Sequence, residues 1–213
     1  MILFLDTVSP LPEFSLIADK KIILSKKIIN NHHEKMSYYL IKSYTDLEKK
    51  FSLDQKLENL IINIGPGSYT SLRIGIAFFS GLSMSYQIDL KGIPCVDFYK
   101  YLISKDDLLL TGIYIYSANN QKFVCIYDEK KEYYNIHKIE SFNEIKNFKI
   151  KKIISNTELN KDNLNLFKNI KYQSISFKEI IIKNLDAIMK LESPKIIEPI
   201  YISNNKILNY SFV

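Results

Sequence analysis

The chain has 213 residues, a net charge of +6 and a mean hydropathy of −0.08, which suits one large or two small globular domains. Its two cysteines, Cys95 and Cys125, form no pattern, which argues against a disulfide framework or zinc site and favours a reducing, cytoplasmic compartment. No apolar run reaches membrane-spanning length, and the first residues lack the basic leader of a signal peptide. Lysines and acidic residues alternate over most of the chain, so the charge indicates general composition more than a nucleic-acid site.

The first half of the chain predicts three strands, a helix, and then two further strands that alternate with helices. The expected strands are 2–7, 13–18, 21–28, 59–64 and 90–96, and the expected helices are about 32–51, 68–86 and 97–104. The first helix carries an apolar stripe at helical spacing, formed by Met36, Leu40, Tyr44, Leu47 and Phe51. This order of elements predicts a mixed α/β sheet.

A second half follows the polar break at 105–107. Its pattern predicts strands at 108–116, 122–127 and 132–139, and a helix at about 177–191. We therefore expect two domains, 1–104 and 105–213, of which the second is a degenerate copy of the first.

The most informative segment is Gly65-Pro-Gly-Ser-Tyr-Thr-Ser-Leu-Arg-Ile-Gly75, which joins a buried strand to a long apolar helix. Its first four residues, the motif turn, are Gly65, Pro66, Gly67 and Ser68. They lack the Gly-Lys-Ser/Thr ending of a P-loop, so we favour a tight turn with Ser68 or Thr70 as helix N-cap. A bound small anion is the second interpretation. Arg73 is the only arginine, which favours a geometric role because a guanidinium can bind in a fork.

These residues resemble the signature of the TsaB (YeaZ) family, bacterial accessory proteins in tRNA threonylcarbamoyladenosine biosynthesis related to the Gcp/TsaD "glycoprotease" proteins. Three further segments fit in order: Ile2-Leu-Phe-Leu-Asp-Thr7, His32-His-Glu-Lys-Met36 and Glu198-Pro-Ile-Tyr-Ile202. The chain departs from the family at Ser117-Ala-Asn-Asn120, where Asp-Ala-Arg is usual. The resemblance implies an α/β fold of the ribonuclease-H-like, actin-like (ASKHA) type, with two related halves whose mixed sheets are flanked by helices.

The resemblance also shows which catalytic features the chain lacks. Actin-like ATPases follow the aspartate that corresponds to Asp6 with a Gly-rich hairpin. Here Pro10 and Pro12 follow instead and remove N–H donors that a phosphate cradle needs. Catalytic relatives carry His-x-Glu-x-His, but Met36 stands at the second histidine, and a thioether is a poor ligand there. We therefore expect no metal and no cofactor, and we interpret Asp6 as the cap of a turn.

The resemblance implies a non-catalytic partner subunit that binds and supports a TsaD-type enzyme, which threonylcarbamoylates the tRNA adenosine next to the anticodon. A TsaE-type ATPase would join the assembly, tRNA would be contacted only indirectly, no membrane would be involved, and the lone chain could form a homodimer. The alternatives are an ATP-dependent transferase or peptidase-like enzyme, and a stand-alone tRNA-binding module.

The helix at 68–86 is apolar on nearly every face, so it must be covered on more than one side. We expect it to pack beside the helix at 32–51 and to form the association surface with it. The expected partner-binding residues are His32, Met36, Tyr39, Leu40, Arg73, Ala77, Ser80 and Met84.

Overall fold

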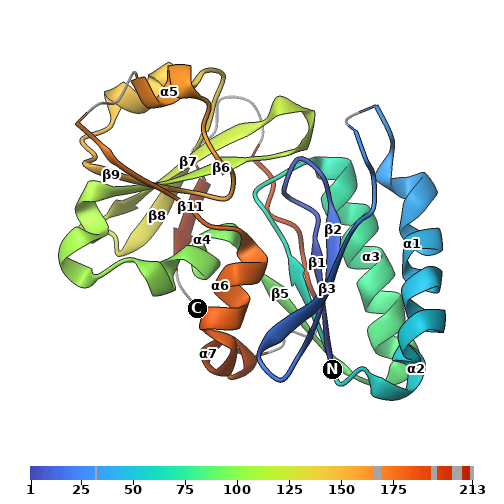
Figure 1. Cartoon of the computed structure of the whole chain (residues 1–213). Coiled ribbons are helices and arrows are strands. Elements are labelled where there is room, and N and C mark those ends of the chain that lie inside the picture. Colours follow the sequence, from blue (N-terminus) through green and yellow to red (C-terminus); the bar gives the residue numbers. More distant parts are fainter. Residues whose placement is uncertain (32, 166–168, 193–195, 203–207, 212–213) are drawn as a thin grey trace.

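Two mixed β-sheets, one from each half of the chain, are packed together with helices around them (Figure 1). The structure is a computed structural model that describes residues 1–31, 33–165, 169–192, 196–202 and 208–211. Among these residues no helix is long and apolar enough to cross a membrane.

The first sheet has the strand order β3-β2-β1-β4-β5. Its strands are β1 (Ile2–Asp6), β2 (Glu13–Ala18), β3 (Lys21–Lys27), β4 (Asn59–Asn63) and β5 (Asp89–Ile93). The first three strands pair antiparallel, and β4 and β5 run parallel to β1. The helices of this half are α1 (Met36–Phe51), α2 (Leu53–Lys56) and α3 (Tyr69–Tyr86).

The second sheet repeats this topology. Its strands are β6 (Thr111–Tyr116), β7 (Lys122–Asp128), β8 (Tyr133–Ile139), β9 (Lys152–Ser155), β10 (Lys171–Ser174) and β11 (Leu208–Ser211). The order β10-β9-β6-β7-β8-β11 mirrors that of β5-β4-β1-β2-β3, with β11 added beyond β8. The directions also match, because β6, β7 and β8 are antiparallel and β9 and β10 run parallel to β6. The predicted relation between the two halves is confirmed.

The connecting helices are much shorter in the second half, which accounts for its degenerate sequence pattern. These helices are α5 (Lys161–Asn165), α6 (Phe177–Lys183) and α7 (Leu185–Met189), with 3₁₀ helices η2 (Lys105–Leu110), η3 (Ala118–Asn120) and η4 (Phe142–Asn147). Between the halves lie α4 (Cys95–Tyr99) and η1 (Lys100–Leu102). The six residues of η4 stand where the first half has the 16 of α1.

Several element boundaries differ from the sequence-based expectation. The strand expected at 90–96 ends at Ile93, and the helix expected at about 97–104 begins at Cys95 and continues as η1. The strand expected at 108–116 begins at Thr111, because Ser104 caps η2 by accepting a hydrogen bond from the Asp107 amide. The helix expected at 177–191 is broken at Asn184, whose side chain donates to the Ile180 carbonyl. Helix α1 begins at Met36 because Glu34 turns back and accepts from the Asn30 amide.

Helices α1 and α3 pack side by side over one face of the first sheet, as predicted. The ring of Tyr44 on α1 meets Phe78 on α3 edge-on, with 5.2 Å between ring centroids. The Tyr44 and Tyr86 hydroxyls are 2.9 Å apart, and Tyr86 donates to Glu48 at 2.7 Å. A hydroxyl chain therefore joins the two helices at the edge of their apolar contact.

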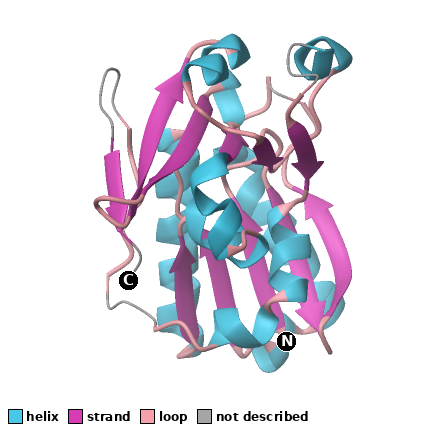
Figure 2. Ribbon diagram, turned by 90° about the vertical axis from the view of Figure 1, so that its left-hand side faces the viewer, coloured by secondary structure: helices cyan, strands magenta, loops and turns pink. Residues whose placement is uncertain are grey.

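Helices α4 and α6 join the two halves through one shared apolar core. Phe98 of α4 packs on Phe177 of α6 with 5.2 Å between ring centroids, and the Tyr99 hydroxyl donates to the Ile175 carbonyl. Figure 2 shows helices both in front of and behind the strands of the first sheet. Burial on both faces explains the apolar runs in β1 and β4.

Two glycines of α3 provide a matched test of this packing. A Cβ at Gly75 would lie 2.3 Å from Cγ2 of the buried Thr7, whereas a Cβ at the exposed Gly81 would meet nothing within 4 Å. We expect Gly75→Ala to lower the free energy of unfolding by about 1–3 kcal/mol through overpacking. Gly81→Ala should raise it by up to about 1 kcal/mol through helix propensity. Urea unfolding of both variants measures this, and a loss of stability in both would contradict it.

Candidate functional site

The motif turn lies where the two halves of the chain meet. The Ser68 amide donates to the Ser117 hydroxyl oxygen at 3.2 Å, and the Ser117 hydroxyl donates to the Val8 carbonyl at 2.7 Å. The Ala118 amide donates to the same carbonyl at 3.3 Å. The turn after β4, the turn after β1 and the loop after β6 are thereby joined by one serine hydroxyl.

Close approach of other segments explains both glycines of the motif turn. Gly65 has φ +111°, and a Cβ there would lie 2.8 Å from the Ile200 carbonyl oxygen. A Cβ at Gly67 would lie 3.1 Å from the Ser117 hydroxyl oxygen. Ser68 occupies the N-cap position of α3, but its side chain makes no capping bond. Its hydroxyl oxygen accepts instead from the side-chain Nδ2 of Asn119 at 3.5 Å. Thr70, the other N-cap candidate, lies inside the helix.

Asp6 at the end of β1 is committed to its own turn. One carboxylate oxygen accepts hydrogen bonds from the amides of Val8 and Ser9, at 2.9 and 3.0 Å. Burial raises the pKa of this carboxyl above its usual range, and the hydrogen bonds from Ser9 and Val8 oppose that shift. The interpretation of Asp6 as a turn cap is confirmed.

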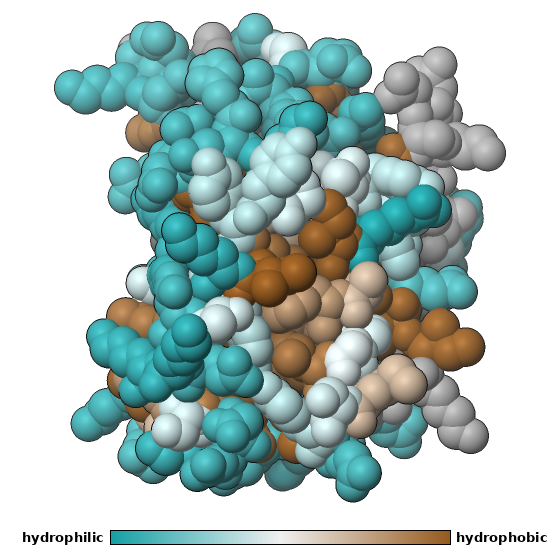
Figure 3. Space-filling view, turned by 90° about the vertical axis from the view of Figure 1, so that its right-hand side faces the viewer, coloured by the Kyte–Doolittle hydropathy of each residue, from teal (hydrophilic) through white to brown (hydrophobic). Residues whose placement is uncertain are grey.

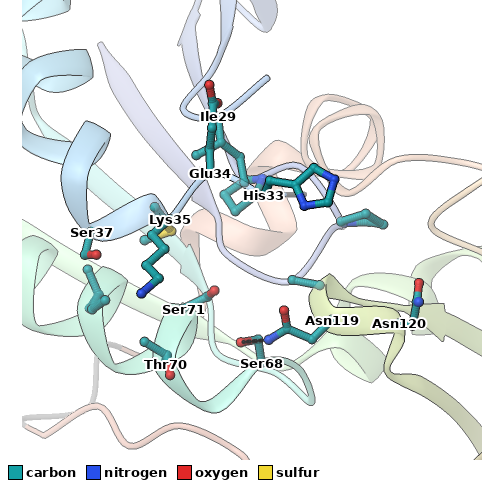
Figure 4. A pocket seen from close by; sticks show the side chains of 15 residues that line it. Ile29, His33, Glu34, Lys35, Ser37, Ser68, Thr70, Ser71, Asn119 and Asn120 are labelled. Carbon is teal, nitrogen blue, oxygen red and sulfur yellow. Dashed lines mark hydrogen bonds between the residues drawn. The ribbon is translucent and has the colours of Figure 1, made fainter. Parts of the chain in front are cut away.

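A cavity of about 650 Å³ opens beside this junction (Figure 4). Its lining comes from the β1–β2 turn, the start of α1, the start of α3 and the loop around η3, and its polar members include His33, Lys35, Ser68, Thr70, Ser71 and Asn119. Figure 4 shows Lys35 extending toward the first turn of α3. The hydroxyls and the Lys35 ammonium group suit a small anion. The Glu34 carboxylate in the same lining opposes one, and Pro10 and Pro12 supply no N–H donors.

The described residues contain no cluster of three metal-ligating side chains. His32, one of the expected partner-binding residues, lies outside the described residues. Met36 is buried under α1 and is 4% exposed, so its thioether belongs to the core.

The outward side of α1 and α3 is the second candidate site. In the described part of the chain nine large hydrophobic side chains are exposed, and five of them lie on these two helices: Tyr38, Tyr39, Ile41, Tyr69 and Met84. Figure 3 shows hydrophobic groups gathered in the middle of this side of the molecule. We define the α1–α3 face as the outward side of both helices, made of Tyr38, Ile41, Ile74, Ala77, Gly81 and Met84.

The expected partner-binding residues fall into two groups. Tyr39, Arg73, Ala77 and Met84 are exposed, and Ser80 is half-buried. Met36 and Leu40 are 4% and 2% exposed, so the expectation that they contact a partner is wrong. Both share the core side of α1 with Tyr44 and Leu47, since positions four apart lie on one helix face.

Sequence analysis missed Tyr38 and Ile41 of α1, which are 74% and 66% exposed. Ile41 lies seven residues before Glu48, on the same helix face, and Glu48 binds Tyr86 of α3. Ile41 therefore borders the groove between the two helices. Tyr39 lies seven residues before Asp46, on the same face of α1, and Asp46 pairs with Lys26 of β3. Tyr39 therefore points toward β3, away from α3.

Arg73 is held by aromatic groups on the side of α3 that faces the C-terminal segment. Its guanidinium lies 3.9 Å from the centroid of the Tyr69 ring, and its Nε donates to the Tyr201 hydroxyl at 2.8 Å. The Tyr69 and Tyr201 rings lie 4.4 Å apart. A hollow of about 400 Å³ between α3 and the C-terminal segment is lined by Arg73, Ala77, Glu198 and Tyr201, among others. The geometric role expected for Arg73 thus includes fastening the C-terminal segment to α3.

Comparison with known proteins agrees with this architecture. The family model described as TsaD, tRNA N6-adenosine threonylcarbamoyltransferase, matches residues 26–190. The chain belongs to the TsaD family. Membership in the TsaD family connects it with tRNA threonylcarbamoylation at the level of the family. No curated protein matches the sequence significantly.

Two solved structures share the fold over nearly their whole length. One is an uncharacterized protein with similarity to peptidase YEAZ from Pseudomonas aeruginosa, with TM-score 0.60, 12% identity, and 95% of this chain and 99% of that one covered. The other is YeaZ from Pseudomonas aeruginosa, with TM-score 0.57, 13% identity, and coverage of 94% and 99%. The predicted TsaB (YeaZ) relationship and the two-lobed actin-like α/β fold are confirmed.

The buried carboxyl of Asp6 generates a pH-dependent prediction. The pKa of this carboxyl is higher in the folded chain than in the unfolded chain. As the pH rises, the unfolded chain therefore loses its proton first, and the free energy of unfolding falls until the pH passes the folded-state pKa. Asp6→Asn keeps an acceptor oxygen for Val8 and Ser9 and carries no charge. We expect the variant to melt at a higher temperature than the parent at pH 7 and at the same temperature near pH 3. Circular dichroism melts across this range decide it; a variant that is less stable at pH 7 would refute the assignment.

Proposed function

We propose that the chain is a non-catalytic partner subunit that binds a TsaD-type catalytic protein through the α1–α3 face. The observation that carries the proposal is the exposure of large apolar side chains on two helices that pack together. Tyr38, Ile41 and Met84 are 74%, 66% and 82% exposed. Contiguous apolar surface of this kind marks a protein interaction site on a folded chain.

The shape of the face suits another pair of helices. Ala77 and Gly81 lie one turn apart on the outward side of α3, and a Cβ at Gly81 would meet nothing within 4 Å. Small residues at such positions let a second helix approach closely. The same face could pair with a second copy of the chain when the catalytic partner is absent. A TsaE-type ATPase would join the complete assembly.

The turn after β1, which in actin-like ATPases belongs to the nucleotide site, supports a role without catalysis. In the catalytic arrangement expected from the resemblance, the aspartate after the first strand faces a metal. Here Asp6 accepts from its own backbone, and the turn that follows contains Pro10 and Pro12. The proposed division of labour leaves nucleotide and substrate chemistry to the partner.

A charge on the α1–α3 face should break association. Ala77→Glu places a carboxylate on the exposed side of α3, one turn after Arg73, and removing it from water in an interface would cost about 3 kcal/mol, about a hundredfold in Kd. Ala187→Glu is the matched control, because Ala187 is also exposed but lies on α7. Sedimentation and a binding titration with a purified TsaD-type protein measure both variants.

The expected result is loss of binding in Ala77→Glu alone, with an unchanged circular dichroism spectrum in both. Equal binding by both variants would refute the α1–α3 face as the interface. Loss of the fold in Ala77→Glu would show that this side of α3 belongs to the core.

The isolated chain should not bind Mg-ATP. The reason is the proline-bearing turn after Asp6, whose carboxylate is already hydrogen-bonded to the backbone. Isothermal titration calorimetry with the purified chain tests this. A micromolar dissociation constant with about one site would favour the alternative of an ATP-dependent enzyme.

A further inference from the structure

The excess positive charge of the chain is concentrated in one segment of the second half. Residues 146–171 contain seven lysines and only two acidic residues, Glu158 and Asp162, a net charge of +5 within a chain of net charge +6. This segment runs from η4 through β9 and α5 to β10. The charge is therefore a local feature of the second sheet rather than a general property of the composition.

Strand pairing brings several of these lysines together. Lys152 of β9 and Lys171 of β10 are direct partners on neighbouring parallel strands, so their side chains leave the same face of the sheet. The Lys171 amide also donates to the Lys151 carbonyl at 2.9 Å. Lys149 lies just before them in the chain and is exposed, as are Lys151 and Lys171. We call Lys149, Lys151, Lys152 and Lys171 the lysine edge, because they gather at the amino ends of β9 and of the edge strand β10.

The lysine edge is not neutralised within the described part of the chain. None of its four members forms an ion pair with another described residue. The end of η2 lies beside the cluster, since the Lys151 amide donates to the Leu110 carbonyl, but neither Asp106 nor Asp107 of η2 forms an ion pair with these lysines. Like charges directly opposite on neighbouring strands destabilise a sheet. A bound polyanion would relieve that repulsion.

We propose that the lysine edge binds the phosphate backbone of RNA, the tRNA on which the assembly acts. Four lysines at the amino ends of two neighbouring strands suit phosphates, which are contacted without reading sequence. The choice of RNA rests on the proposed function, since the family model describes a tRNA-modifying enzyme. Figure 1 places β9 and α1 at opposite sides of the molecule, so the α1–α3 face stays open to the protein partner while RNA is bound. Direct contact with tRNA replaces the indirect contact expected from the sequence.

The test compares two triple variants of the isolated full-length chain. Lys151→Gln/Lys152→Gln/Lys171→Gln neutralises the lysine edge. Lys130→Gln/Lys183→Gln/Lys190→Gln removes the same charge from exposed lysines that each have an acidic residue within four positions along the chain. Binding of unmodified tRNA is followed by fluorescence anisotropy from low to physiological salt, with melting curves to show that both variants fold.

We expect the lysine-edge variant to bind tRNA at least tenfold more weakly than the parent at low salt. The slope of log K against log salt should become shallower by about 0.9 for each phosphate that the variant no longer neutralises. The control variant should show less than half of that effect. If the triple variant does not fold, Lys149→Gln/Lys171→Gln replaces it with the same expectation.

The proposal is overturned if parent and lysine-edge variant bind tRNA equally, if both triple variants lose affinity equally, or if the parent does not bind tRNA at all. Binding of the parent to phosphatidylserine vesicles, without binding to tRNA, would assign the edge to a membrane surface and also overturn it. Association with a TsaD-type protein is measured separately on the same variants, so a failure of the α1–α3 interface is distinguished from a failure of RNA binding.

Discussion

The bridge made by the Ser117 hydroxyl is the constraint on which the arrangement of the two halves depends. This single group accepts from the Ser68 amide and donates to the Val8 carbonyl, so the motif turn and the β1–β2 turn cannot move independently. The bridge is buried, which makes loss of either bond costly because an unpaired polar group would remain. The glycines at 65 and 67 follow from it, because only residues without a Cβ allow the second half and the C-terminal segment to approach this closely.

The same constraint also positions a cavity at the junction of the two halves. The topology that brings β1, β4 and β6 together still assembles a cavity at the junction of the halves. Beside this cavity, Asp6 binds the amides of Val8 and Ser9, and in its lining Asn119 approaches Ser68. The turn after β1 therefore offers a phosphate no free amide at Val8 or Ser9, since both donors are already bonded to Asp6.

Much of the fold could be predicted from periodicity, because buried strands and a long helix leave strong patterns in the sequence. The site was less predictable. A helical stripe such as Met36 and Leu40 looks the same whether a sheet or a partner covers it, and only the position of β-strands beneath α1 decides between them. A geometric role for Arg73 was foreseeable, but Tyr201, which accepts the hydrogen bond of its Nε, is 128 positions away. The surplus of lysines at 146–171 is visible in the sequence, whereas the register that sets Lys152 beside Lys171 is not.

The α1–α3 face and the lysine edge would bind by different interactions, apolar contact in one case and charge in the other, and they lie on different halves of the duplicated fold. In the first half, long helices cover one face of the sheet and present apolar groups outward, which favours a protein partner. In the second half, η4 and α5 are too short to do this, and the strands β9 and β10 begin with lysines, β10 being an edge strand. An edge strand with charged side chains resists pairing with another sheet. The same charges attract a polyanion, so shortening the helices of one half exchanges a protein-binding face for an electrostatic one.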